Sequence, residues 1–196
     1  MRTVFGSFMF MVMAAAACTA RAQEPVQPKP QRFDVAVILD ATRTNLSAGG
    51  SFWMQGGSAE AGGSFFHGLG AVAQLTGTHS GSISAAGEPL TLVTIAFGPR
   101  YMWHAPSRKG SHPVAIFGQT LFGASHGSDS AFPVGTSVNS SATSFAFQAG
   151  GGIDWKLSSH AGWRMLQADW LHTQLPNGST NAQNHLLLNT GIVLSF

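Results

Sequence analysis

The sequence predicts an all-β protein, an eight-stranded antiparallel up-and-down β-barrel that crosses a membrane. Apolar residues alternate with small or polar residues along most of the chain, as in a strand with two unlike faces. The alternating segments are about 10–14 residues long, which suits tilted strands in a bilayer and exceeds the usual strand length in soluble sheets. Charged residues make up only 9% of the 196 residues, whereas typical soluble domains contain about 25%.

The first 22 residues have the organisation of an export signal. Arg2 supplies a positive start, residues 8–17 are uninterruptedly apolar, and Ala20-Arg21-Ala22 has the small-x-small pattern of a cleavage site. Lipidation at Cys18 is the alternative to removal of this segment. Residues 23–32 contain three prolines and predict a short extended lead-in. We therefore expect a signal peptide over 1–22 and a barrel over 33–196.

Eight segments define the predicted strands. The first, third, fourth, sixth and eighth alternate clearly, the second is rich in glycine, and the fifth alternates poorly. In chain order the segments are 33–42, 54–65, 69–79, 90–103, 112–125, 142–155, 161–173 and 184–196.

The fourth, sixth and eighth segments show the two faces best. The apolar face of the fourth carries Val93, Ile95, Phe97, Pro99, Tyr101 and Trp103. The corresponding face of the sixth carries Phe145, Phe147, Ala149, Gly151, Ile153 and Trp155. Aromatic residues near strand ends favour contact with lipid, and glycines on the opposite face favour a narrow barrel. The large apolar side chains are therefore expected to point outward.

The connections between segments alternate in length. Residues 43–53, 80–89, 126–141 and 174–183 form long connections rich in Gly, Ser, Asn and Thr, whereas 66–68 and 156–160 are short and 104–111 is intermediate. A transmembrane barrel of this kind has long external loops and short periplasmic turns. Both ends of the barrel chain are then expected on the periplasmic side.

These features resemble the small OmpA-like and OmpX-like outer-membrane barrels. The resemblance rests on the export signal, the eight segments, Gly98-Pro99-Arg100 and the terminal Phe196, and it covers residues 33–196. It implies a bacterial outer-membrane location, contact with outer-membrane lipid and lipopolysaccharide, and a monomer. It also implies an assembly signal read by the outer-membrane insertion machinery, which would consist of Leu188, Ile192, Leu194 and Phe196.

Several polar residues fall on the predicted inner faces. They are Glu60, Arg100, Gln148, Asp154, Gln167 and Asp169. Charges in a narrow interior of low dielectric constant need a partner, so we expect a network of side chains that fills the lumen. An ion path, as in a narrow pore or a solute-binding barrel, is the alternative. Arg164 shares a phase with Leu166 and Trp170, so it is expected to face lipid near the periplasmic rim.

The sequence points to no catalytic, cofactor or metal site. The eight histidines lack the spacing of a metal motif, and no cysteine follows residue 22. His126-Gly127-Ser128 resembles the first part of the lipid A deacylase pattern, but no glutamate follows Ser128. We therefore expect a structural or interaction barrel that acts through its external loops. A lipid A-modifying enzyme is the alternative.

A nucleic-acid partner is not expected. Residues after position 22 comprise eight basic and eight acidic side chains, which offer no basic stripe for phosphates.

Overall fold

The computed structural model describes residues 32–45, 50–83, 87–105 and 114–196. The predicted export signal, Cys18 and nearly all of the lead-in lie outside these residues. Within them, no helix is long and apolar enough to cross a membrane.

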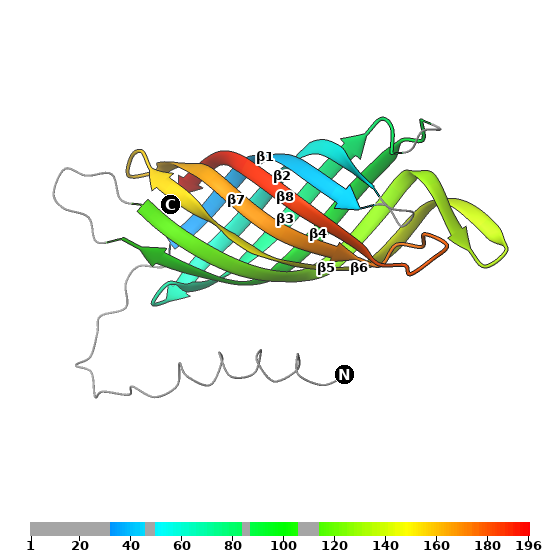
Figure 1. Ribbon diagram of the computed structural model, residues 1–196. Coiled ribbons are helices and arrows are strands. Elements are labelled where there is room, and N and C mark those ends of the chain that lie inside the picture. The colour runs from blue at the N-terminus through cyan, green and yellow to red at the C-terminus, as the bar shows by residue number, and fades with distance from the viewer. Residues whose placement is uncertain (1–31, 46–49, 84–86, 106–113) are drawn as a thin grey trace, which may run out of the picture. The chain divides into compact units, whose positions relative to one another are not determined.

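Eight antiparallel strands follow one another around a closed barrel, which confirms the predicted fold class (Figure 1). Strands β1 and β8 complete the closure by pairing from Asp34 opposite Ser195 to Thr44 opposite His185. Closure leaves no free edge along the barrel wall. The strands are β1 (Arg32–Asn45), β2 (Ser51–Phe66), β3 (Leu69–Ser80), β4 (Leu90–His104), β5 (Val114–Val134), β6 (Ser137–Lys156), β7 (Ala161–Thr173) and β8 (Gln183–Ser195).

The alternation of faces is as predicted. In β3 every second side chain is buried, from Gly70 through Gln74 to Ser80, while Leu75 and its outward neighbours are exposed. The outward residues of the other strands include large apolar side chains such as Leu39 and Phe97, which are 70% and 69% exposed. The barrel thus has a largely apolar outer surface and encloses its buried charged side chains.

Two connections differ from the prediction. The connection predicted over 43–53 is shorter, because β1 continues to Asn45 and β2 begins at Ser51. The prediction of a long loop over 126–141 is wrong, because β5 and β6 continue through this region and meet at a tight turn after Val134. Gly135 adopts a φ of 61° there, which favours glycine. The resulting hairpin extends past the ends of the other strands (Figure 1). Both of its faces are largely exposed near the tip, so its sequence has no apolar alternation to reveal the strands.

A two-residue turn joins β2 to β3, as the short connection at 66–68 predicts. His67 and Gly68 have φ angles of 43° and 91°, the positive values of a primed hairpin turn. A Cβ at Gly68 would lie 2.3 Å from the carbonyl oxygen of Met102, so glycine is also required by space. This turn lies at the same end of the barrel as the start of β1 and the end of β8, and we call it the terminal end.

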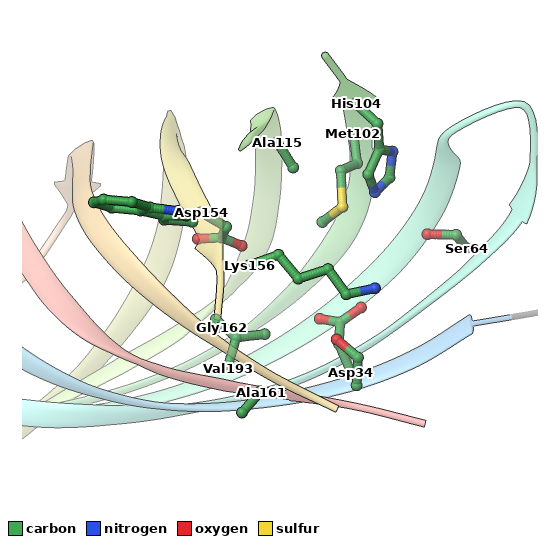
Figure 2. A pocket seen from close by; sticks show the side chains of 12 residues that line it. Asp34, Ser64, Met102, His104, Ala115, Asp154, Lys156, Ala161, Gly162 and Val193 are labelled. Atoms are coloured by element: carbon green, nitrogen blue, oxygen red, sulfur yellow. The ribbon is translucent and has the colours of Figure 1, made fainter. Parts of the chain in front are cut away.

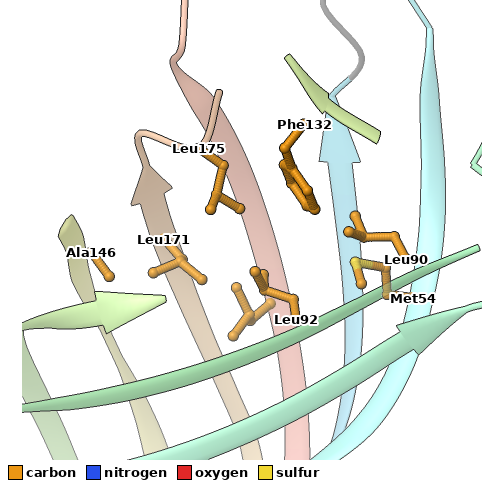
Figure 3. Close-up of a cluster of buried hydrophobic side chains, with 8 residues drawn as sticks. Met54, Leu90, Leu92, Phe132, Ala146, Leu171 and Leu175 are labelled. Atoms are coloured by element: carbon orange, nitrogen blue, oxygen red, sulfur yellow. The ribbon is translucent and has the colours of Figure 1, made fainter. Parts of the chain in front are cut away.

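The interior contains two different layers. An apolar cluster fills the half near the long connections, which we call the loop end, and Figure 3 shows its side chains converging from several strands. Phe132 and Leu175 cap this cluster from the β5–β6 hairpin and the β7–β8 connection. Its buried members are Met54, Leu90, Leu92, Phe132, Ala146, Leu171, Leu175 and Leu187. Charged side chains occupy the half toward the terminal end.

Candidate functional site: the charged network of the lumen

Arg100 on β4 contacts side chains of three other strands, β5, β1 and β2, from inside the barrel. Its Nε donates a hydrogen bond to Oε1 of Gln119 at 2.9 Å, and its Nη1 donates to Oδ2 of Asp34 at 3.2 Å. Its Nη2 donates to Glu60. The planar guanidinium therefore has partners on several sides, as a buried arginine requires.

Arg164 on β7 makes the matching contacts from the other side of the lumen. Its Nε and Nη2 donate to the two carboxylate oxygens of Asp154 at 2.9 and 3.2 Å. Its Nη1 donates to Glu60 at 2.5 Å and to Gln167 at 2.8 Å. Glu60 thus joins the two arginines, and the ion pairs run continuously from Asp34 to Asp154.

Phe117 lies beneath both guanidinium groups. The ring centroid is 4.8 Å from Cζ of Arg100 and 4.4 Å from Cζ of Arg164. Its side chain comes from β5 and is buried. An aromatic face attracts cations and excludes water, so Phe117 supports the ion pairs where water would otherwise weaken them.

The position of Arg164 corrects the sequence analysis. Arg164 was expected to face lipid, but its side chain is fully buried in the lumen. The cause is a β-bulge, because Met165 and Leu166 both face outward and together oppose one residue of β8, Thr190. One extra residue reverses the face of every residue that precedes it in the strand.

Thr190 stabilises this bulge. Its hydroxyl donates to the backbone carbonyl of Arg164 at 2.9 Å and accepts a hydrogen bond from the indole Nε1 of Trp163 at 3.1 Å. A hydroxyl among the apolar outward residues of β8 therefore satisfies a carbonyl group that the bulge takes out of the regular ladder.

A second group of polar side chains lies next to the arginines. Asp169 accepts a hydrogen bond from Gln167 at 2.6 Å, which links it to the Arg164 side of the network. Gln148 donates to Gln74 at 2.8 Å. A Cβ at Gly150 would lie 2.2 Å from Oδ1 of Asp169, so the glycine makes room for this carboxylate.

The structure therefore places all six predicted lumen residues inside the barrel, each at most 8% exposed. Glu60, Arg100, Asp154 and Gln167 share direct contacts, and Asp169 joins through Gln167. Gln148 donates to Gln74 and also interacts with Asp169. The contact residues that the sequence analysis did not select include Asp34, Gln74, Phe117, Gln119, Arg164 and Asn189.

A small cavity of about 80 Å³ opens at the terminal end of this network. The carboxylates of Asp34 and Asp154 line it, and Figure 2 shows the Lys156 side chain extending across the cavity between them. His104 and Ser64 stand on its opposite wall. Asp34 and Asp154 are also the outer members of the ion-pair chain, so the cavity adjoins both ends of that chain.

The His126-Gly127-Ser128 pattern lies on the outer surface of β5 and forms no nucleophile–base chain. Nδ1 of His126 is hydrogen-bonded to the hydroxyl of Thr143 at 2.8 Å. The Ser128 hydroxyl instead donates to Asp129 at 3.3 Å. Among the described residues no group of three or more His, Cys, Asp or Glu side chains is arranged to hold a metal ion.

The four residues of the predicted assembly signal face outward on β8 and its end. Leu188, Ile192 and Leu194 are 37%, 61% and 44% exposed, and Phe196 is 70% exposed. The backbone N–H of Phe196 donates to the carbonyl of Phe33 at 2.8 Å, and the two ring centroids are 6.4 Å apart. The last residue thus takes part in closing the barrel against β1.

Comparisons with known proteins agree with this geometry. No protein-family model and no curated protein matches the sequence. The attachment invasion locus protein Ail of Yersinia pestis, solved in complex with the heparin analogue sucrose octasulfate, is 14% identical, and the match covers 86% of this chain and all of Ail with a TM-score of 0.56. Neisserial surface protein A is 15% identical, and the match covers 84% of this chain and 97% of that protein with a TM-score of 0.64. The chain has the fold of the small eight-stranded outer-membrane barrels.

The match to these barrels concerns the backbone, because the identities are low. It spans nearly the whole length of both solved proteins. The side chains that fill the lumen of this barrel must therefore be understood from its own contacts.

Proposed function

We propose that the protein is a structural or interaction barrel of the bacterial outer membrane, with a lumen closed by side chains and with the loop end as its external contact surface. The observation that carries this proposal is the combination of an apolar outer wall with a continuous layer of buried ion pairs inside. A barrel satisfies every backbone hydrogen bond within the membrane, and the outer wall meets lipid.

The outer wall has the layered composition of a membrane-spanning surface. Exposed aliphatic and phenyl side chains cover its middle, for example Val37, Leu39, Leu75 and Ile95. Exposed tryptophans flank them near the loop end, at Trp53 and Trp170. Transmembrane barrels carry such aromatic girdles at both interfaces. The exposed aromatic residues toward the terminal end are Phe33, Phe65, Phe66, Tyr101, Trp103, Trp155, Trp163 and Phe196.

The interior supports a closed lumen rather than an ion path. The Asp34–Arg100–Glu60–Arg164–Asp154 ion pairs cross the terminal half, and the apolar cluster around Leu171 fills the loop half. A hydrated ion would have to separate paired charges and then cross an apolar layer. Both steps are costly, because neither layer offers the ion a replacement for its water.

Three parts of the barrel would make contacts with other molecules. The outer wall would contact outer-membrane lipid and lipopolysaccharide, the loop end would contact external partners, and Leu188, Ile192, Leu194 and Phe196 would be read by the insertion machinery. The closed β1–β8 seam leaves no strand edge for a second copy, which favours a monomer.

We expect the folded chain to be heat-modifiable and to resist extraction from membranes by carbonate. The closed ladder protects the backbone in detergent, so unboiled and boiled samples should migrate differently in gel electrophoresis. Recovery of the chain in the carbonate-soluble fraction would contradict a membrane-spanning barrel.

The same preparation separates the alternative functions. The proposal expects no stable single-channel conductance in planar bilayers and no release of acyl chains from labelled lipid A. Steady conductance by the wild-type barrel would favour a pore. Turnover that is lost in a Ser128→Ala variant would favour a lipid-modifying enzyme.

Replacing Phe196 by alanine should reduce insertion in cells several-fold while leaving refolding in detergent nearly unchanged. The side chain is exposed and contributes mainly the ring contact with Phe33, so its loss removes little packing. Phe33→Ala is the matched control, since it removes the same ring contact and keeps the terminal aromatic residue. Equal insertion of the wild type and Phe196→Ala would contradict the assembly signal.

A further inference from the structure

A ring of basic and titratable side chains surrounds the outside of the barrel near its loop end. Each of the four strands that run toward this end contributes one outward-facing residue: Arg43 on β1, His79 on β3, His126 on β5 and His172 on β7. The first three are exposed and His172 is half-buried. We call these four residues the collar.

Each collar residue is hydrogen-bonded to a side chain of the following strand. In every case the partner is a hydroxyl or amide side chain, so the ring or guanidinium is held on the wall and kept in a fixed direction. The pairs are Arg43 with Ser51 (3.1 and 3.0 Å), His79 with Thr91 (2.9 Å), His126 with Thr143 (2.8 Å) and His172 with Asn184 (3.1 Å).

The register of the strands places the four residues at one height. Each even-numbered strand lies between two strands that carry collar residues. On it, one residue lies opposite the preceding collar residue, and another, two or four positions closer to the terminal end, lies opposite the following collar residue. Tilted strands require a steady offset of this kind for a level ring. The partners are Trp53 and Gln55 on β2, Thr91 and Val93 on β4, Thr143 and Phe147 on β6, and Asn184 and Leu186 on β8.

The hydrogen bonds determine which nitrogen of His79 gains a proton. The Thr91 hydroxyl donates its single proton to Oδ2 of Asp129 at 2.7 Å, so it must accept from Nδ1–H of His79. The nitrogen left to take up a proton is then Nε2. Protonation converts it from a hydrogen-bond acceptor into a charged donor.

Few other charges face the collar histidines. Asp129 is connected to His79 through Thr91, and it follows Ser128 on the strand that carries His126. The cross-strand neighbours of His126 are Val93 and Thr143, which are neutral.

His172 has a largely uncharged surrounding. Its ring lies 5.8 Å from that of Trp170, it is paired with Asn184, and Phe147 lies opposite it on β6. The residue after Asn184 on β8 is His185, whose side chain is buried and faces the lumen.

We propose that the collar binds the phosphate groups of the lipids that surround the external end of the barrel, and that protonation of its histidines strengthens this binding. The inference rests on the proposed membrane-spanning function. On the terminal side of the collar the wall is apolar, with Val93 and Trp170 exposed to lipid tails, so the collar stands at the level of the headgroups. Arginine binds phosphate at every pH, whereas histidine changes charge between about pH 5 and 8.

The test measures binding of diphosphorylated lipid A to the full chain folded in zwitterionic micelles, at pH 5.5 and pH 8.0. The wild type should bind about tenfold more tightly at the lower pH, since each added charge near an anionic headgroup contributes about fivefold and salt screens part of it. The triple variant H79Q, H126Q, H172Q should lose this ratio. The double variant H67Q, H160Q, whose histidines are exposed at the terminal end, should keep it.

The lipid phosphates also titrate between these pH values, but they do so equally for every variant. Comparing the ratio of the two affinities between variants therefore cancels their contribution. Arg43→Gln should weaken binding equally at both pH values. The proposal is overturned if the wild type and the triple variant show the same ratio, or if lipid A without phosphate groups shows the wild-type ratio. Heat-modifiability of every sample distinguishes failure of the collar proposal from failure of the proposed function. A wild type that does not fold as a barrel would overturn both proposals. A folded wild type whose affinity does not differ between the two pH values would overturn the collar proposal alone.

Discussion

Replacing Arg164 by methionine should destabilise the folded barrel by about 3–5 kcal/mol, because it leaves Glu60 and Asp154 buried without one of their partners. If the side chain faced lipid near the rim, as unbroken alternation predicts, the same change would cost only about 0–1 kcal/mol or stabilise the barrel. Reversible unfolding by urea in lipid or detergent, followed by tryptophan fluorescence, measures the difference.

Met165→Arg is the matched control, because Met165 is the adjacent outward residue at the same depth. It should cost about 0–1 kcal/mol. A cost of Arg164→Met as small as that of the control would mean that the bulge does not turn Arg164 into the lumen.

The bulge also explains how far the sequence predicts the site. A period of two assigns inner faces wherever a strand is regular, and this was enough for Glu60, Arg100 and Asp154. Counting by two fails at Met165-Leu166, where two large apolar residues stand together between polar ones. That doublet is the local signal of an extra outward residue, and reading it would have placed Arg164 beside Gln167 inside the barrel.

Other residues were missed for different reasons. Asp34 lies on the inner phase of a clear strand, so alternation alone contains the information. Gln119 and Phe117 belong to a strand whose alternation is weak, and an inward phenylalanine looks like an outward one until its guanidinium neighbours are known. From Val134 to Ser141 the β5–β6 hairpin is exposed on both faces, so no periodicity in this part of the sequence distinguishes strand from loop.

Glu60 forms ion pairs with both arginines, so its neutralisation should lower the free energy of unfolding. Glu60→Gln and Arg100→Met should each destabilise the barrel by about 3–5 kcal/mol, because each leaves buried charge without its partner. The double variant should lose less than the two single losses combined, and less than either alone, since it removes both members of a buried pair. The coupling energy between the two side chains should therefore reach at least about 3 kcal/mol, the upper end of the range for side chains in direct contact.

Glu88→Gln provides the control for loss of a carboxylate, since Glu88 is exposed on the β3–β4 connection. It should leave the free energy of unfolding unchanged within about 0.5 kcal/mol. Additive losses for Glu60→Gln and Arg100→Met would show that the two side chains do not interact in the folded barrel. Because Glu60 also contacts Arg164, a second cycle with Arg164→Met should give coupling of the same sign, which only a shared carboxylate between two arginines explains.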